Sequence, residues 1–196
     1  MPEPGCGAVL LAAGASSRLG QPKQLVRIEG EPLLRRAVRM ACEAGCDPVA
    51  VVLGYEAEWM RGALDGLAAM PVVNEEWREG IGSSLRFGAA ALIGLDACPG
   101  NILLLVCDQV ALSAELLRGL LRIHGSDGAI TAARYGGRLG VPAVFSSDFF
   151  PELLAVAGDQ GAREILKRHA GQVRAVDFPG GELDLDTPEQ LGAVNR

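Results

Sequence analysis

Short apolar segments alternate with longer amphipathic ones along the whole chain, and no other feature constrains the fold as strongly. The short segments suit buried strands, and the longer ones repeat apolar residues at helical spacing. This pattern is typical of a Rossmann-like α/β domain, with a mainly parallel central sheet flanked by helices. We predict about seven strands in one sheet, over residues 8–12, 49–53, 72–73, 102–106, 129–133, 143–145 and 173–176.

Capping residues delimit the predicted helices. Pro32 suits a first helical turn and Gly45 a helix end, which places the first helix between them. Further helices are expected after residue 55, from residue 83 or 84, over residues 113–124 and 161–169, and from a capping box at Thr187.

Length and composition fit one globular domain over residues 1–196. Apolar residues make up 49% of the chain and charged residues 21%, which excludes a disordered protein. No apolar stretch approaches the ~20 residues that span a bilayer, so no membrane partner is expected. Five cysteines without a Cys-x-x-Cys pair indicate reduced thiols rather than a zinc site, and we expect a cytoplasmic protein.

The formal net charge of −6 argues against nucleic acid as a partner, because nucleic-acid binding depends on basic surface. An acidic protein that binds a nucleoside triphosphate must gather its cations locally and recruit a divalent metal. Isolated basic residues in glycine-rich loops are therefore informative in this chain.

One such loop follows the first predicted strand, where residues 11–23 read LAAGASSRLGQPK. Small residues such as Ala13, Gly14 and Ser16 let backbone N–H groups approach an anion, and Arg18 and Lys23 add positive charge. The loop would lie at the carboxyl edge of the sheet, where α/β proteins bind ligands. We therefore predict a polyphosphate site.

The loop differs from two widespread phosphate-binding motifs. A P-loop has four residues between its glycines and then Gly-Lys-Ser/Thr, whereas five residues separate Gly14 from Gly20, and Gln24 follows Lys23. A dinucleotide-binding turn needs a glycine where this chain has Ser16. Both motifs are excluded.

Carboxylates follow the predicted strand 102–106 and recur near the carboxyl terminus. Asp108 comes directly after that apolar strand, which makes it the best candidate for a metal ligand. Asp184 and Asp186 alternate along an extended segment and would face the same side, and we favour Asp186 because it precedes a capped helix. The alternative for each carboxylate is a capping role at a turn or helix start.

These motifs resemble those of the GT-A-like nucleotidyltransferases, in particular the branch that contains molybdenum cofactor cytidylyltransferase. The family pattern Leu-Ala-Ala/Gly-Gly-x-Ser/x-x-Arg-x-Gly-x-x-Lys falls on Leu11, Ala12, Ala13, Gly14, Ser16, Arg18, Gly20 and Lys23. The resemblance implies that Arg18, Lys23 and Asp108 are catalytic and that Asp108 and Asp186 hold Mg²⁺. Val110 stands where the family usually has proline after its Cys-Asp-Gln string.

The segment 74–85, NEEWREGIGSSL, resembles the family's second nucleotide loop. The resemblance adds Asn74, Gly80, Ser83 and Ser84 to the nucleotide-binding residues, alongside residues 11–14, Ser16, Arg18 and Lys23 of the first loop. Two later segments, 140–145 and 158–163, also resemble this branch and would lie beside the acceptor. Arg163 would contact an acceptor phosphate or simply belong to a helix-start loop.

The resemblance implies transfer of a cytidylyl group from CTP to a molybdopterin-type cofactor, with release of pyrophosphate. Guanylyl-transferring relatives commonly have glycine at the place of Ala13, which favours a pyrimidine here. The alternatives are a nucleotidyltransferase that uses GTP or a sugar-phosphate acceptor, and a non-catalytic protein that delivers the cofactor. A molybdenum hydroxylase is a further partner that the resemblance implies.

Overall fold

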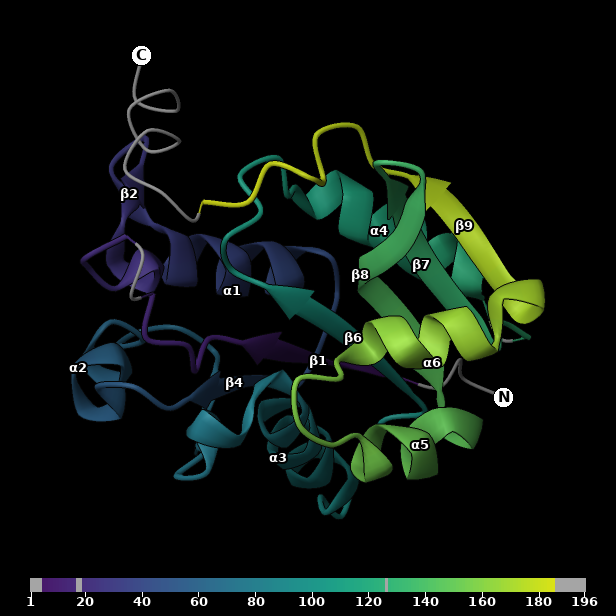
Figure 1. Ribbon diagram of the computed structural model, residues 1–196, viewed down its shortest axis with the longest axis horizontal. Coiled ribbons are helices and arrows are strands. Elements are labelled where there is room, and N and C mark those ends of the chain that lie inside the picture. Colours follow the sequence, from purple (N-terminus) through teal and green to yellow (C-terminus); the bar gives the residue numbers. More distant parts are fainter. Residues whose placement is uncertain (1–4, 17–18, 126, 186–196) are drawn as a thin grey trace.

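A seven-stranded mixed sheet forms the centre of the molecule, with strand order β5-β4-β1-β6-β8-β7-β9 (Figure 1). The computed structural model describes residues 5–16, 19–125 and 127–185. The strands are β1 (Cys6–Leu11), β4 (Val49–Leu53), β5 (Met70–Val73), β6 (Asn101–Val106), β7 (Ile130–Tyr135), β8 (Arg138–Ser146) and β9 (Val173–Asp177). β8 runs antiparallel to its two neighbours, and the remaining pairs are parallel. A short separate ribbon joins β2 (Arg27–Ile28) to β3 (Glu31–Pro32).

The parallel centre of the sheet is buried on both faces. Leu10 of β1 lies in register with Val51 of β4 and Leu105 of β6, and all three side chains are fully buried. Strands covered on both sides have no solvent face to alternate with, which is why their sequences read as continuous apolar runs. Their shared direction brings the ends of β1 and β6 to one edge of the sheet.

Helices cover both faces of this sheet (Figure 1). Buried residues of α1 (Leu33–Glu43), α2 (Ala57–Gly62) and α4 (Ala114–His124) pack in one apolar cluster. Those of α3 (Ile81–Ile93), α5 (Phe150–Ala155) and α6 (Ala162–Arg168) pack in the other. The result is a three-layer α/β domain, in agreement with the predicted fold class.

Most boundaries lie within a few residues of the predicted ones, and the differences have local causes. Helix α3 begins at Ile81, ahead of the predicted serines, because Gly80 is its N-cap residue. Strand β8 is longer than predicted, since it pairs along its length with β7. Helix α5 was not predicted, because its six residues are too few to show a clear period. The helix predicted from Thr187 lies outside the described residues.

His124, the last residue of α4, is buried although it is a titratable side chain at a helix end. Its ring nitrogens lie 3.2 Å from Thr131 Oγ1 and 3.0 Å from Asn101 Oδ1. Burial and the nearby Arg174 lower the pKa of this imidazole. Across the described ranges, no helix is long and apolar enough to cross a membrane.

Candidate functional site

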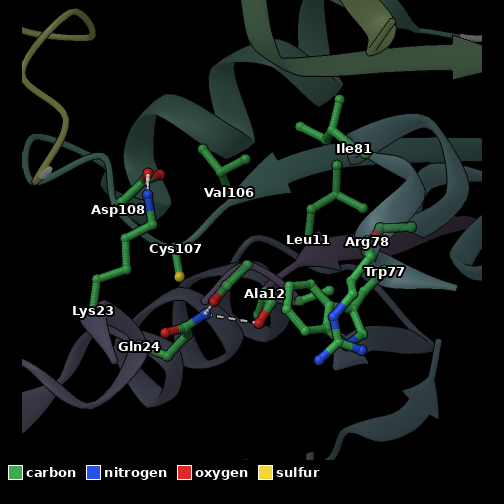
Figure 2. A pocket seen from close by; sticks show the side chains of 14 residues that line it. Leu11, Ala12, Lys23, Gln24, Trp77, Arg78, Ile81, Val106, Cys107 and Asp108 are labelled. Carbon is green, nitrogen blue, oxygen red and sulfur yellow. Dashed lines mark hydrogen bonds and ion pairs between the residues drawn. The ribbon is translucent and has the colours of Figure 1, made fainter. Parts of the chain in front are cut away.

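A cavity of about 440 Å³ opens where β1 and β6 end (Figure 2). It is lined by Leu11, Ala12, Ala13, Gly14, Lys23, Gln24, Trp77, Arg78, Gly80, Ile81, Ser84, Val106, Cys107 and Asp108. The glycine-rich loop, the second loop and the end of β6 therefore meet in one place. This is the edge of the sheet at which the sequence predicts a ligand.

Lys23 and Asp108 form an ion pair at one end of the cavity (Figure 2). Lys23 comes from the short 3₁₀ turn Lys23–Leu25 and Asp108 from the loop after β6, and their side chains are 20% and 13% exposed. Lys23 Nζ donates to Asp108 Oδ2. Asp108 Oδ1 is buried and has no hydrogen-bond partner among the described residues. A buried carboxylate oxygen without a donor is suited to a cation.

The neighbouring Cys107 is a poor nucleophile. Burial, together with the charge of Asp108, raises the pKa of its thiol to about 12, although Lys23 acts in the opposite direction. The thiol therefore stays protonated at neutral pH. It contributes a small apolar surface to the cavity wall.

Gln24 fixes the shape of the glycine-rich loop. Its amide Nε2 donates to the carbonyl oxygens of Ala12, at 2.9 Å, and Gly14, at 2.8 Å. The hydroxyl of Ser16 accepts the backbone N–H of Lys23 at 3.1 Å. Two carbonyls are thus held by one side chain that is only 1% exposed. Sequence reasoning missed this role, for which a polar residue directly after the loop lysine was the available signal.

Two predicted residues, Arg18 and Asp186, lie outside the described residues. The chain leading to Asp186 nevertheless runs beside the loop of Asp108. Gln109 and Asp184 form an antiparallel bridge, and the N–H of Leu185 donates to the carbonyl oxygen of Asp108 at 3.2 Å. The carboxyl-terminal segment is therefore attached to the loop that carries the candidate metal ligand.

Asn74 takes a different place from the one predicted. Its side chain is fully buried and donates to Ser83 Oγ and Ser84 Oγ, both at 3.0 Å, while its Oδ1 accepts the N–H of Glu76 at 3.0 Å. Both amide hydrogens are used inside the protein, and of these four residues only Ser84 lines the cavity. Asn74 and Ser83 therefore lie behind the wall, and a direct contact of Asn74 with a base is not supported.

An aromatic pair lies at the other end of the cavity. Trp77 meets Tyr55 edge-on with ring centroids 5.8 Å apart, and the guanidinium of Arg78 lies 4.4 Å from the Trp77 ring centroid. Trp77 also packs so closely on Gly54 that a Cβ there would come within 2.6 Å of the indole side chain. Trp77 therefore packs against Tyr55 and Gly54, and it borders the cavity as well.

Gly80 joins the second loop to a segment far along the chain. Its φ of +113° lies in a region that favours glycine, and a Cβ there would lie 2.5 Å from Asp159 Oδ1 and 2.6 Å from the carbonyl oxygen of Gly158. The N–H of Gly82 donates to that same carbonyl at 2.9 Å. The loop 158–161 is therefore seated directly on the second loop.

A second cavity of about 390 Å³ adjoins the first and shares Leu11, Ile81 and Val106 with it. It is further lined by Tyr135, Gly140, Val141, Asp159, Gln160, Gly161, Ala162, Arg163, Glu164 and Lys167. Both segments that the sequence places beside an acceptor, 140–145 and 158–163, contribute to this wall. The first segment belongs to β8 and the second leads into α6, and these two elements pack against each other.

Tyr135 and Gln109 fix the backbone of Val141, which lines the second cavity. Tyr135 donates its hydroxyl to the carbonyl oxygen of Val141 at 3.0 Å, and Gln109 Nε2 donates to the same carbonyl at 3.1 Å and to that of Gly181 at 3.0 Å. Burial raises the pKa of Tyr135, as does the charge of Asp184. The phenol therefore remains neutral and serves as a hydrogen-bond donor.

Comparison with known proteins assigns the chain to a family. Residues 8–173 match the model described as the MobA-like NTP transferase domain. The chain belongs to this family. The nucleotidyltransferase family expected from the loop motifs is thereby confirmed, although the match does not single out its molybdenum cofactor cytidylyltransferase branch.

Proteins similar to this chain have diverse names. Nicotine blue oxidoreductase of Paenarthrobacter nicotinovorans is 35% identical over 93% of both chains. Purine catabolism protein PucB of Bacillus subtilis (strain 168) is 31% identical over 96% of this chain and 95% of the relative. The structure of Rv0371c from Mycobacterium tuberculosis H37Rv matches with a TM-score of 0.82 and 31% identity, covering 100% of this chain and 99% of the other. Rv0371c has also been solved in complex with manganese.

Proposed function

We propose that this NTP transferase moves a cytidylyl group from CTP to the phosphate of a molybdopterin-type cofactor and releases pyrophosphate. The observation that carries the proposal is the Lys23–Asp108 pair, with its buried unpartnered Oδ1, at the edge of a cavity bounded by a glycine-rich loop. A cation donor and a metal-ready carboxylate at one end of a nucleotide-sized cavity suit phosphoryl transfer.

The donor set at Asp108 fits Mg²⁺. A hard cation takes carboxylate oxygens, and Oδ1 of Asp108 offers one that no described donor occupies. Asp186 would supply the second carboxylate, and it directly follows Leu185, whose N–H is bonded to the Asp108 backbone. The bound metal would neutralise phosphate charge. Rv0371c, which is similar to this chain, has been solved in complex with manganese, and this supports a divalent ion here.

The protein's own groups would bind and align the triphosphate. Lys23 and Arg18 would contact the phosphates, and the backbone from Ala12 to Gly14, fixed by Gln24, would present N–H groups to the nucleotide. The reaction needs no general base, because the acceptor phosphate is already ionised. The chain's contribution is alignment of the acceptor with the α-phosphorus and stabilisation of the leaving pyrophosphate.

Base recognition would depend on the far end of the same cavity. Ser84 and Gly80 line it directly, whereas Asn74 and Ser83 act by orienting the second loop. Trp77 and Arg78 border the same end and would flank the base. Ala13, in the cavity wall, narrows the site relative to glycine and supports a pyrimidine.

The test is pyrophosphate release by purified protein with Mg²⁺ and molybdenum cofactor, with CTP, GTP, ATP and UTP in parallel. Release with CTP alone supports the proposal, and release with GTP alone assigns the guanylyl reaction. Replacing the cofactor by sugar phosphates tests the other acceptor class. Asp108→Asn should lower turnover at least about a hundredfold, while the exposed control Asp96→Asn should behave as wild type. Near-normal turnover of Asp108→Asn removes Asp108 from the metal site, and binding without turnover indicates a delivery protein.

Similarity to nicotine blue oxidoreductase favours a second candidate, an oxidoreductase that uses the same two adjoining cavities. Titration with NADH and NADPH separates the two activities. Tight dinucleotide binding that CTP does not displace would favour the oxidoreductase. Absence of such binding, together with pyrophosphate release, would leave nucleotidyl transfer.

A further inference from the structure

A third cavity adjoins the second. It measures about 380 Å³ and is lined by Arg138, Leu139, Arg163, Leu166, Lys167 and Ala170. It shares Arg163 and Lys167 with the second cavity and no described lining residue with the first. The second cavity therefore lies between the nucleotide cavity and this outer one.

The order of the cavities separates two positions along a bound acceptor. The reacting group must reach the boundary of the first and second cavities, near Val106, because Asp108 and Lys23 lie in the first. Arg163 and Lys167 lie at the opposite boundary, between the second and third cavities. The second cavity, of about 390 Å³, therefore has two boundaries, with the candidate metal ligand beyond the inner one and the arginines at the outer one.

Charge at this outer boundary is positive and incompletely paired. The side chains of Arg163 and Arg138 form no hydrogen bond or ion pair with any residue that the structure describes, whereas Lys167 is paired with Glu164 at 2.7 Å. By contrast, Arg168, on the same helix α6, is bound to Glu152 at 2.6 Å. Two guanidinium groups without carboxylate partners beside one cavity, in a chain of net charge −6, suit an anionic ligand.

The wall between the two positions combines apolar side chains with the polar residues Asp159 and Gln160. Leu11, Ile81 and Val106 form its inner part, and Val141 continues it toward the arginines. Tyr135 contributes an aromatic ring whose hydroxyl is already bonded to the Val141 carbonyl. Such a wall suits a flat or weakly polar molecular body between two charged ends.

We propose that the acceptor is an elongated molecule with two anionic groups, and that Arg163 and Arg138 bind the group that does not react. The inference rests on the proposed nucleotidyl transfer and names the substrate class of its second cavity. The reacting phosphate lies near Val106, the apolar body spans the second cavity, and the second anion lies between β8 and α6. A small acceptor with a single charged group would not reach the two arginines.

Steady-state kinetics with CTP and molybdenum cofactor test the inference. Arg163→Ala and Arg138→Ala should each raise the KM for the acceptor about tenfold to a hundredfold. Their KM for CTP and their kcat should remain within about twofold of wild type. Arg163→Lys should raise the acceptor KM less than Arg163→Ala does, because lysine keeps the positive charge but lacks the two parallel N–H donors of a guanidinium. The control Arg168→Ala, on the same helix but outside all three cavities, should keep the wild-type KM.

Two further results separate this inference from the proposed function. Turnover by wild type with an unchanged acceptor KM in both arginine variants would overturn the inference and leave nucleotidyl transfer standing. If wild type shows no turnover, calorimetric titration with inorganic phosphate in saturating CTP decides. Phosphate binding by wild type that is lost in Arg163→Ala and Arg138→Ala supports the anion site. No phosphate binding by wild type, or equal binding by the variants, overturns the inference.

Discussion

Gly80→Ala should weaken the protein and its site together, because Gly80 is the point where the two loops touch. The alanine would have to adopt a φ near +113° with ψ near −180°, a region open essentially to glycine. Its Cβ would also lie 2.6 Å from the Gly158 carbonyl oxygen and 2.7 Å from the carbonyl carbon, which are backbone atoms that cannot swing aside. The backbone strain costs about 1–3 kcal/mol and the overlap about as much, so we expect about 2–6 kcal/mol of destabilisation.

Urea unfolding followed by circular dichroism measures this loss directly, since a small domain of ~5–15 kcal/mol stability shows it as a clear shift of midpoint. The matched control is Gly119→Ala in α4, where a Cβ meets nothing within 4 Å. That change should stabilise the helix by about 0.5–1 kcal/mol. At temperatures where Gly80→Ala is folded, the KM for CTP should rise, because the displaced second loop lines the nucleotide cavity. A loss below about 1 kcal/mol would refute the assigned contact.

Two other predictions concern charge. Lys23→Ala should raise the dissociation constant of CTP about tenfold or more, since one charge-assisted contact to the triphosphate is lost; an unchanged constant in calorimetry would remove Lys23 from the phosphate site. His124 is buried with a pKa lowered from 6.5, so the unfolded state binds more protons, and stability present above that pH should fall as the solution is acidified below it. His124→Asn should reduce this slope in urea titrations between about pH 7.5 and 5, and equal slopes in both proteins would contradict the assignment.

The sequence was sufficient for those parts of the fold that are governed by local pattern. The apolar runs predicted the seven strands, because strands buried on both faces read as short continuous apolar runs between turn residues. Helix α1 ends as expected before Gly45, whose φ is +95°. The antiparallel direction of β8 was missed, although its signal is local: the two-residue turn Gly136-Gly137, with φ of +54° and +72°, joins β7 to β8 as a hairpin.

The candidate site was predictable where chemistry sits at a strand end and not where it depends on packing. Asp108 and Lys23 were named from their positions after β6 and in the glycine-rich loop, and the structure pairs them. Asn74 was predicted to contact the base, whereas the structure shows its amide bonded to Ser83 and Ser84. An asparagine that contacts a base and one that bonds two serines cannot be told apart in sequence. The roles of Gln24 and Arg138 were missed, and that of Arg163 was named only in part, since these roles depend on contacts between distant segments.

The division of the wall between two cavities has an evolutionary consequence. Apart from three shared residues, the first cavity is built before residue 109 and the second mainly from residues 135–167. Under the proposed function, substitutions in the later part of the chain would select a new acceptor while the triphosphate end stays intact. A family organised in this way can diversify its substrates one half at a time, in line with relatives of similar length that carry unrelated names.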